Sequence, residues 1–68
     1  MKVKILEDRA TFRRFLRMIR KSKILAPMLK DHWERTIVFE IEDNEDGAIM
    51  SSVIKEFIVS QKLRYEEF

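Results

Sequence analysis

Residues 35–42, Arg-Thr-Ile-Val-Phe-Glu-Ile-Glu, decide the fold of this chain. Successive side chains of a strand point to opposite faces, so one face of this stretch carries Ile37, Phe39 and Ile41. The other face carries Val38, Glu40 and Glu42. The pattern predicts a strand that packs one face against a core and leaves the other mostly in solvent.

A helical pattern precedes this strand. Asp8 is a good N-cap, because its carboxylate can accept hydrogen bonds from the free amides of a first helical turn. The apolar residues that follow are spaced i, i+3, i+4 and i+7, which is one stripe of an amphipathic helix. They are Phe12, Phe15, Leu16 and Ile19. We expect this helix over residues 9–23.

A second helical pattern follows the strand. Residues 43–47 are expected to form a turn, in which Asp43 or Asn44 caps a helix over residues 46–61. Glu45 and Asp46 suit the positive end of the helix dipole. The apolar stripe consists of Met50, Val53, Ile54, Phe57 and Ile58. Its β-branched residues would also suit a strand, but the helical period and the N-terminal acids favour a helix.

The segment between the first helix and the strand contains Pro27. Proline disfavours helical geometry at the preceding residue, so residues 24–27 are interpreted as a break. Pro27 then begins a short second helical turn. Leu25, Met28, Leu29 and His32 have helical spacing there. A single helix kinked at Pro27 is the competing interpretation.

Both ends of the chain alternate polar and apolar residues, which predicts strands over residues 2–6 and 63–68. The expected fold is a small two-layer α+β domain of order β-α-β-α-β, with a three-stranded sheet and two amphipathic helices on one face. It is a single domain over residues 1–68. This order resembles small ferredoxin-like and ribosomal-protein domains in topology alone, and topology implies no function. The predicted core comprises Val3, Ile5, Phe12, Phe15, Leu16, Ile19, Ile37, Phe39, Ile41, Met50, Val53, Ile54 and Phe57.

The amino-acid composition of the chain excludes several kinds of functional site. The chain has no cysteine, so disulfides and thiolate metal sites are excluded, and one histidine argues against structural zinc. The single glycine rules out a glycine-rich phosphate loop. No apolar run approaches the roughly 20 residues that span a bilayer, and the charged N-terminus does not resemble a signal peptide. We expect a cytoplasmic location, no membrane partner, no metal and no cofactor.

Two local patterns bear on catalysis and metal binding. Residues 42–47 resemble the start of a calcium loop, but the twelfth position is Val53 where a bidentate glutamate is needed. Helix capping is the favoured interpretation. His32 lacks an evident nucleophile and orienting partner, and packing at the edge of the core is favoured for it. We therefore expect a protein that is not an enzyme and has no catalytic residues.

Charge is distributed unevenly along the chain. Residues 1–35 carry 11 Lys/Arg and 4 Asp/Glu, a net charge of +7, whereas residues 36–68 carry 3 and 8, a net charge of −5. At about 100° per residue, five cations fall on one outer face of the first helix. They are Arg13, Arg14, Arg17, Arg20 and Lys21. Such a face can bind phosphates or an acidic partner, and the alternative is a solvated helix exterior.

The favoured function is a small binding or regulatory module that contacts the backbone of nucleic acid through these five cations, without assigned base readers. The alternative is a protein-interaction module, a homodimer in which the basic helix pairs with an acidic surface around Glu40, Glu42, Asp43, Glu45 and Asp46. Trp33, Val38, Tyr65 and Phe68 are candidate interface residues. The rings of Trp33, Tyr65 and Phe68 can stack on bases, fill a subunit interface or complete the core. A small enzyme and a membrane-surface helix are minor alternatives.

Overall fold

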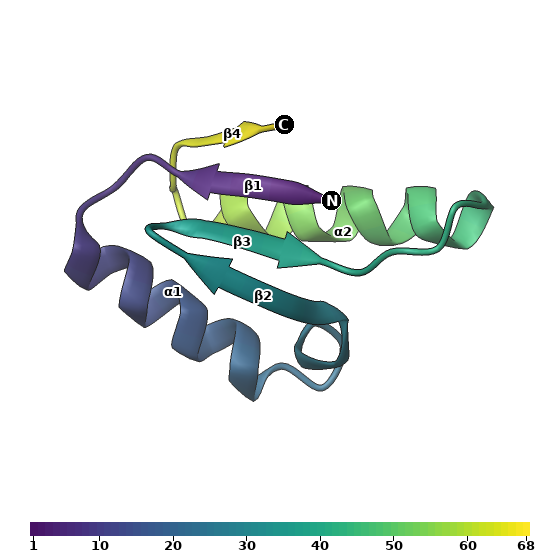
Figure 1. Cartoon of the computed structure of the whole chain (residues 1–68), viewed down its shortest axis with the longest axis horizontal. Coiled ribbons are helices and arrows are strands. Elements are labelled where there is room, and N and C mark those ends of the chain that lie inside the picture. Colours follow the sequence, from purple (N-terminus) through teal and green to yellow (C-terminus); the bar gives the residue numbers. More distant parts are fainter.

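The computed structural model describes all 68 residues and contains two α-helices, one 3-10 turn and four strands (Figure 1). The elements in chain order are β1 (Lys2–Ile5), α1 (Arg9–Lys21), η1 (Ala26–Met28), β2 (Leu29–Trp33), β3 (Thr36–Phe39), α2 (Glu45–Ser60) and β4 (Tyr65–Glu67). The expected α+β class is therefore confirmed. Neither helix is long and apolar enough to cross a membrane.

The sheet has four strands, in the order β2-β3-β1-β4, and every neighbouring pair is antiparallel. The prediction of three strands was wrong. The first helix connects β1 to β2 at the sheet edge, and β3 lies between these two strands (Figure 1). The resulting element order, β-α-β-β-α-β, is that of the split β-α-β motif.

The missed strand is β2. Pro27 is the second residue of a three-residue 3-10 turn that begins at Ala26, one residue earlier than expected, and its fixed φ permits this position. The chain then becomes extended at Leu29 and does not continue as a helix. The helical spacing of Leu29 and His32 was misleading because β2 has no simple alternation. A register irregularity between Leu29 and Asp31 interrupts it, and the exposed Lys30 and Asp31 are residue types that suit a sheet edge.

The remaining boundaries are close to the predicted ones. Asp8 caps α1 as expected, accepting a hydrogen bond from the Thr11 amide at 2.8 Å, and α1 ends at Lys21. Asn44 caps α2 through the Gly47 amide at 3.0 Å, so α2 begins at Glu45. The predicted strands are each shorter in the structure, and the central one covers only Thr36–Phe39.

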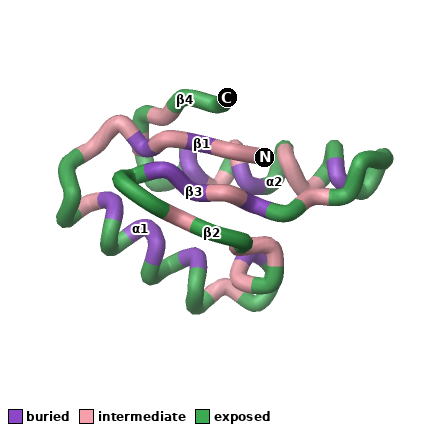
Figure 2. Tube along the Cα trace, viewed as in Figure 1, coloured by how far each residue is buried: buried purple, intermediate pink, exposed green.

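The core is one cluster of 11 buried residues to which both helices and the two central strands contribute (Figure 2). Val3 pairs with Ile37 across β1 and β3, and the Phe15 and Phe57 rings stack with centroids 5.5 Å apart. Of the predicted core, Val53 is 37% exposed and was wrongly included, while Ile41, Met50 and Phe57 are only partly buried. Leu25 and Ile58 are buried and were missed.

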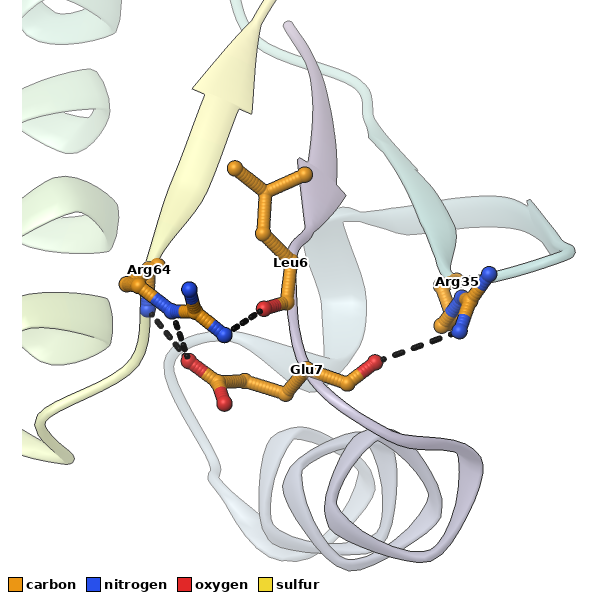
Figure 3. A network of polar contacts seen from close by, with 4 residues as sticks. All are labelled: Leu6, Glu7, Arg35 and Arg64. Carbon is orange, nitrogen blue, oxygen red and sulfur yellow. Dashed lines mark hydrogen bonds and ion pairs between the residues drawn. The ribbon is translucent and has the colours of Figure 1, made fainter.

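A polar network joins the β1–α1 connection to the segment before β4 (Figure 3). One carboxylate oxygen of Glu7 accepts from the Arg64 amide at 2.9 Å and from its Nε at 3.2 Å. Arg64 Nη2 also donates to the Leu6 carbonyl at 2.9 Å. These hydrogen bonds, the one from the Arg64 amide first, hold the pKa of Glu7 below its ordinary value of 4.5. Glu7 is thus stabilised in its ionised form.

This network predicts an acid-dependent loss of stability. Because the folded-state pKa of Glu7 is lowered, its contribution is complete above its ordinary pKa of 4.5 and is lost as the pH falls through the lowered value. Glu7→Gln should therefore be less stable than wild type at neutral pH, and the difference should narrow below about pH 4.5. Urea unfolding at several pH values measures this. Glu56→Gln, at an exposed position without an ion pair, is the control. A Glu7→Gln difference that is the same at neutral and acid pH would show that the carboxylate charge is irrelevant.

Candidate functional site

A groove with a volume of about 770 Å³ lies between α1 and the β2–β3 hairpin. It is hereafter called the basic groove. Its lining contains six Lys or Arg side chains, one histidine and one carboxylate, and only two apolar residues. The lining residues are Lys4, Arg9, Phe12, Arg13, Leu16, Arg17, Arg20, His32, Glu34 and Arg35. The groove is open to solvent and strongly cationic.

The amphipathic pattern of α1 creates one wall of the basic groove. Phe12 and Leu16 are 6% and 5% exposed, because they extend from the apolar stripe into the core cluster. Arg13, Arg17 and Arg20 follow at helical spacing and are exposed. Burial of the stripe therefore fixes the side of α1 on which the arginines stand.

The structure divides the five predicted cations into two sets. Arg13, Arg17 and Arg20 line the basic groove, whereas Arg14 and Lys21 are exposed on α1 outside it. Arg14 instead donates to the Thr11 hydroxyl at 3.3 Å. The three remaining cations of the groove, Lys4, Arg9 and Arg35, were missed. They come from β1, the first position of α1 and the β2–β3 turn, and only the fold brings them together.

His32 lies on β2 and meets α1 across the groove. Its Nε2 is 2.8 Å from Nη2 of Arg20. A guanidinium can only donate, so Nε2 of His32 is the acceptor in this contact. The half-buried His32 pairs in register with Ile37, which agrees with the expected position at the edge of the core. The contact with His32 also orients the side chain of Arg20.

The cations of the basic groove have no ion-pair partners. The two salt bridges of the chain join Lys55 to Glu67 at 3.0 Å and Arg64 to Glu7 at 3.2 Å, and both lie outside the groove. Arg35 donates only to a backbone carbonyl, that of Glu7, at 3.4 Å (Figure 3). Clustered, unpaired cations repel one another, so an anion entering the groove would relieve an unfavourable field.

The acidic surface expected around Glu40 and Glu42 lies outside the basic groove. The segment between β3 and α2 runs to the end of the molecule opposite the β2–β3 turn (Figure 1). There Glu40, Glu42 and Asp46 surround a smaller pocket of about 310 Å³, whose apolar members are Met28, Ile41 and Met50. No group of three His, Asp or Glu side chains anywhere in the chain converges as metal ligands would.

The four candidate interface residues separate into two groups. Tyr65 is half-buried and packs against the core cluster. Trp33 and Phe68 are exposed, by 44% and 65%, and Lys2 Nζ lies 5.5 Å and 5.9 Å from the centroids of their rings. Val38 is half-buried on β3. Its register partners are Lys2 on β1 and Asp31 on β2.

No protein-family model matches the chain, and comparisons with curated proteins and with solved structures found no similar protein.

The turn that borders the basic groove has an unfavourable backbone conformation. Glu34 and Arg35 form a two-residue connection between β2 and β3, with φ of 43° and 70°. Two-residue hairpins with positive φ at both positions strongly prefer Asn-Gly, and other residues lose about 1–2 kcal/mol each in this region. Strain of this kind is often retained where side chains serve a function, and both side chains line the groove.

Relieving this strain should stabilise the fold. Glu34→Asn combined with Arg35→Gly leaves the net charge unchanged and should raise the free energy of unfolding by about 1–2 kcal/mol. The urea midpoint should rise without a change in slope. The single variant Arg35→Lys retains the strain and the charge and is the control. A double variant that unfolds at lower urea than wild type would show that the side-chain contacts of the turn outweigh its backbone strain.

Proposed function

We propose that this protein is a non-enzymatic binding module that holds the phosphate backbone of a nucleic acid in the basic groove. The observation that carries the proposal is the convergence of six cations without ion-pair partners on one groove. Five of these cations lie on α1 or in the β2–β3 turn, and four of the five are arginines of α1. Arginine suits phosphate because its planar guanidinium can donate two parallel hydrogen bonds.

The dimensions of α1 suit a backbone contact. Its 13 residues span about 20 Å, and Arg9, Arg13, Arg17 and Arg20 recur once per turn along the groove side. A row of this length can follow several successive phosphates. Backbone contacts of this kind fix the position of a strand and carry no sequence information themselves. The groove contains no evident base reader, so we expect little sequence preference from it.

The acidic segment does not oppose this interaction. Glu34 is the only carboxylate that lines the groove, whereas Glu40, Glu42 and Asp46 line a separate pocket. The basic and acidic parts of the chain thus form two separate surfaces in the fold, and the basic surface lines the groove.

We further infer that both helices cover the same face of the sheet and leave the other face open. Supporting this layering, Val3, Ile5, Ile37 and Phe39 alternate with less buried residues along β1 and β3 and belong to the cluster that contains residues of both helices. The stacked Phe15 and Phe57 rings join α1 to α2 directly. We propose a cytoplasmic location, because the chain carries no cysteine and nucleic acids are present there.

A protein-interaction module is the second candidate. The pocket of Glu40, Glu42 and Asp46 is complementary in charge to the basic groove, and its three apolar residues would gain from being covered. In a homodimer, the acidic surface of each copy would occupy the groove of the other. The melting temperature would then rise with protein concentration, which backbone binding does not require.

Paired charge substitutions test the nucleic-acid proposal. Arg13→Gln with Arg17→Gln removes two cations from the groove, whereas Arg14→Gln with Lys21→Gln removes two from α1 outside it. We expect the first pair to lower affinity for a short DNA duplex and to reduce the slope of log K against log salt by about 2 units. The second pair should change the slope much less. Fluorescence anisotropy at several salt concentrations measures both.

Two results would contradict the proposal. Equal losses from the two pairs would show that total charge matters and the groove does not. Undetectable binding of wild type to any nucleic acid at low salt, with the fold intact by circular dichroism, would leave the protein-interaction module as the better account.

A further inference from the structure

The face of the sheet away from the core carries an exposed aromatic pair. Val3 and Ile5 are buried, so Lys2 and Lys4 of β1 point to the opposite face. The register places Thr36, Val38 and Glu66 beside them, and Trp33 pairs with Thr36 on β2. Phe68 follows β4, and its amide donates to the Lys2 carbonyl at 3.0 Å. Trp33 and Phe68 thereby reach one surface from distant parts of the chain.

Lys2 stands between the two rings. Its Nζ lies 5.5 Å from the centroid of Trp33 and 5.9 Å from that of Phe68, within the range of about 6 Å for attraction between a cation and a ring. Both rings therefore lie close to the same ammonium group. Neither ring belongs to the core cluster, and both remain substantially exposed. The core does not account for their presence here.

The charge of this face differs from that of the basic groove. Lys2 and Lys4 share this face with Asp31 and Glu66, so cations and carboxylates are mixed on it. A surface of this kind is poorly suited to track phosphates, but exposed rings stack on bases of any sequence. The groove has the opposite character, with six cations and few apolar residues. The cationic groove suits the phosphates of a nucleotide chain, and the exposed rings suit its bases.

Lys4 connects the two surfaces. It lines the basic groove, and by register it lies on the open face with Lys2. A ligand that follows α1 can therefore continue past Lys4 onto the sheet. In a duplex the bases are stacked inside and unavailable to Trp33 and Phe68, whereas a single strand exposes them.

We propose that the ligand is single-stranded nucleic acid, whose backbone lies in the basic groove and whose bases stack on Trp33 and Phe68 across the open face of the sheet. This inference rests on the proposed function and specifies its ligand. Protein partners are disfavoured because an acidic surface suited to the groove would gain nothing from the rings, and an apolar surface suited to the rings would not use the cations.

Trp33 is the only tryptophan, so its fluorescence reports on this face alone. The probes are an oligodeoxythymidylate of about 15 nucleotides, a duplex of the same length and polyglutamate. We expect the single strand to bind more tightly than the duplex and to quench Trp33. Trp33→Ala and Phe68→Ala should each weaken single-strand binding by roughly 5- to 150-fold, as loss of one stacked base predicts, and should leave duplex binding nearly unchanged. Val59→Ala, at an exposed position on α2, is the matched control.

The outcomes separate this inference from the proposed function. Equal binding of single strand and duplex, without quenching and without an effect of Trp33→Ala, would overturn stacking and leave backbone binding in place. Polyglutamate binding as tight as that of the oligonucleotide would overturn it in favour of an acidic protein partner. Absence of binding to either nucleic acid would overturn both. The quenching of wild type is informative even if a ring variant fails to fold.

Discussion

The burial of the apolar stripe of α1 is the constraint on which the rest of the molecule depends. Phe12, Phe15, Leu16 and Ile19 are at most 6% exposed, and each contributes about 1.5–3 kcal/mol by leaving water. No rotation of α1 can expose its arginines differently without removing these side chains from the core. The orientation of the basic groove is therefore a consequence of core packing, and the cations are held in place by residues that never meet a ligand.

The same packing makes the groove electrostatically unfavourable when empty. Six cations face one another across it with Glu34 as the only carboxylate, and the turn on its border has positive φ at two non-glycine residues. Both features lower the stability of this domain of 68 residues, and domains of this size have a small free energy of unfolding. A polyanion in the groove would remove the repulsion, so stability and binding are coupled in this protein.

The sequence predicted what depends on local pattern, and it failed where pairing between distant segments decides. The stripe of α1, the Asp8 cap and the cross-strand faces of β1 and β3 are confirmed because each follows from a period or from one side chain and its nearest amides. The strand β2 was missed because its residues are mostly exposed and interrupted by an irregularity in register, so its extended form depends on pairing with β3. The predicted groove was therefore incomplete. His32 lies on β2 and Arg35 lies in the turn that follows it, and Lys4 and Arg9 join the groove only through the fold. Likewise, the grouping of Trp33, Lys2 and Phe68 requires the register of four strands.

The central claim is that one single strand of nucleic acid contacts both the basic groove and the open face of the sheet. Amide chemical shifts of the ¹⁵N-labelled protein, followed during titration with oligodeoxythymidylate, test it most directly. The account predicts that the shifted amides form one continuous surface that includes Arg13, Arg17, Lys4 and Trp33, while the acidic segment around Glu42 stays unchanged. Shifts centred on Glu42 and Asp46, or shifts on α1 with none on the sheet, would contradict it.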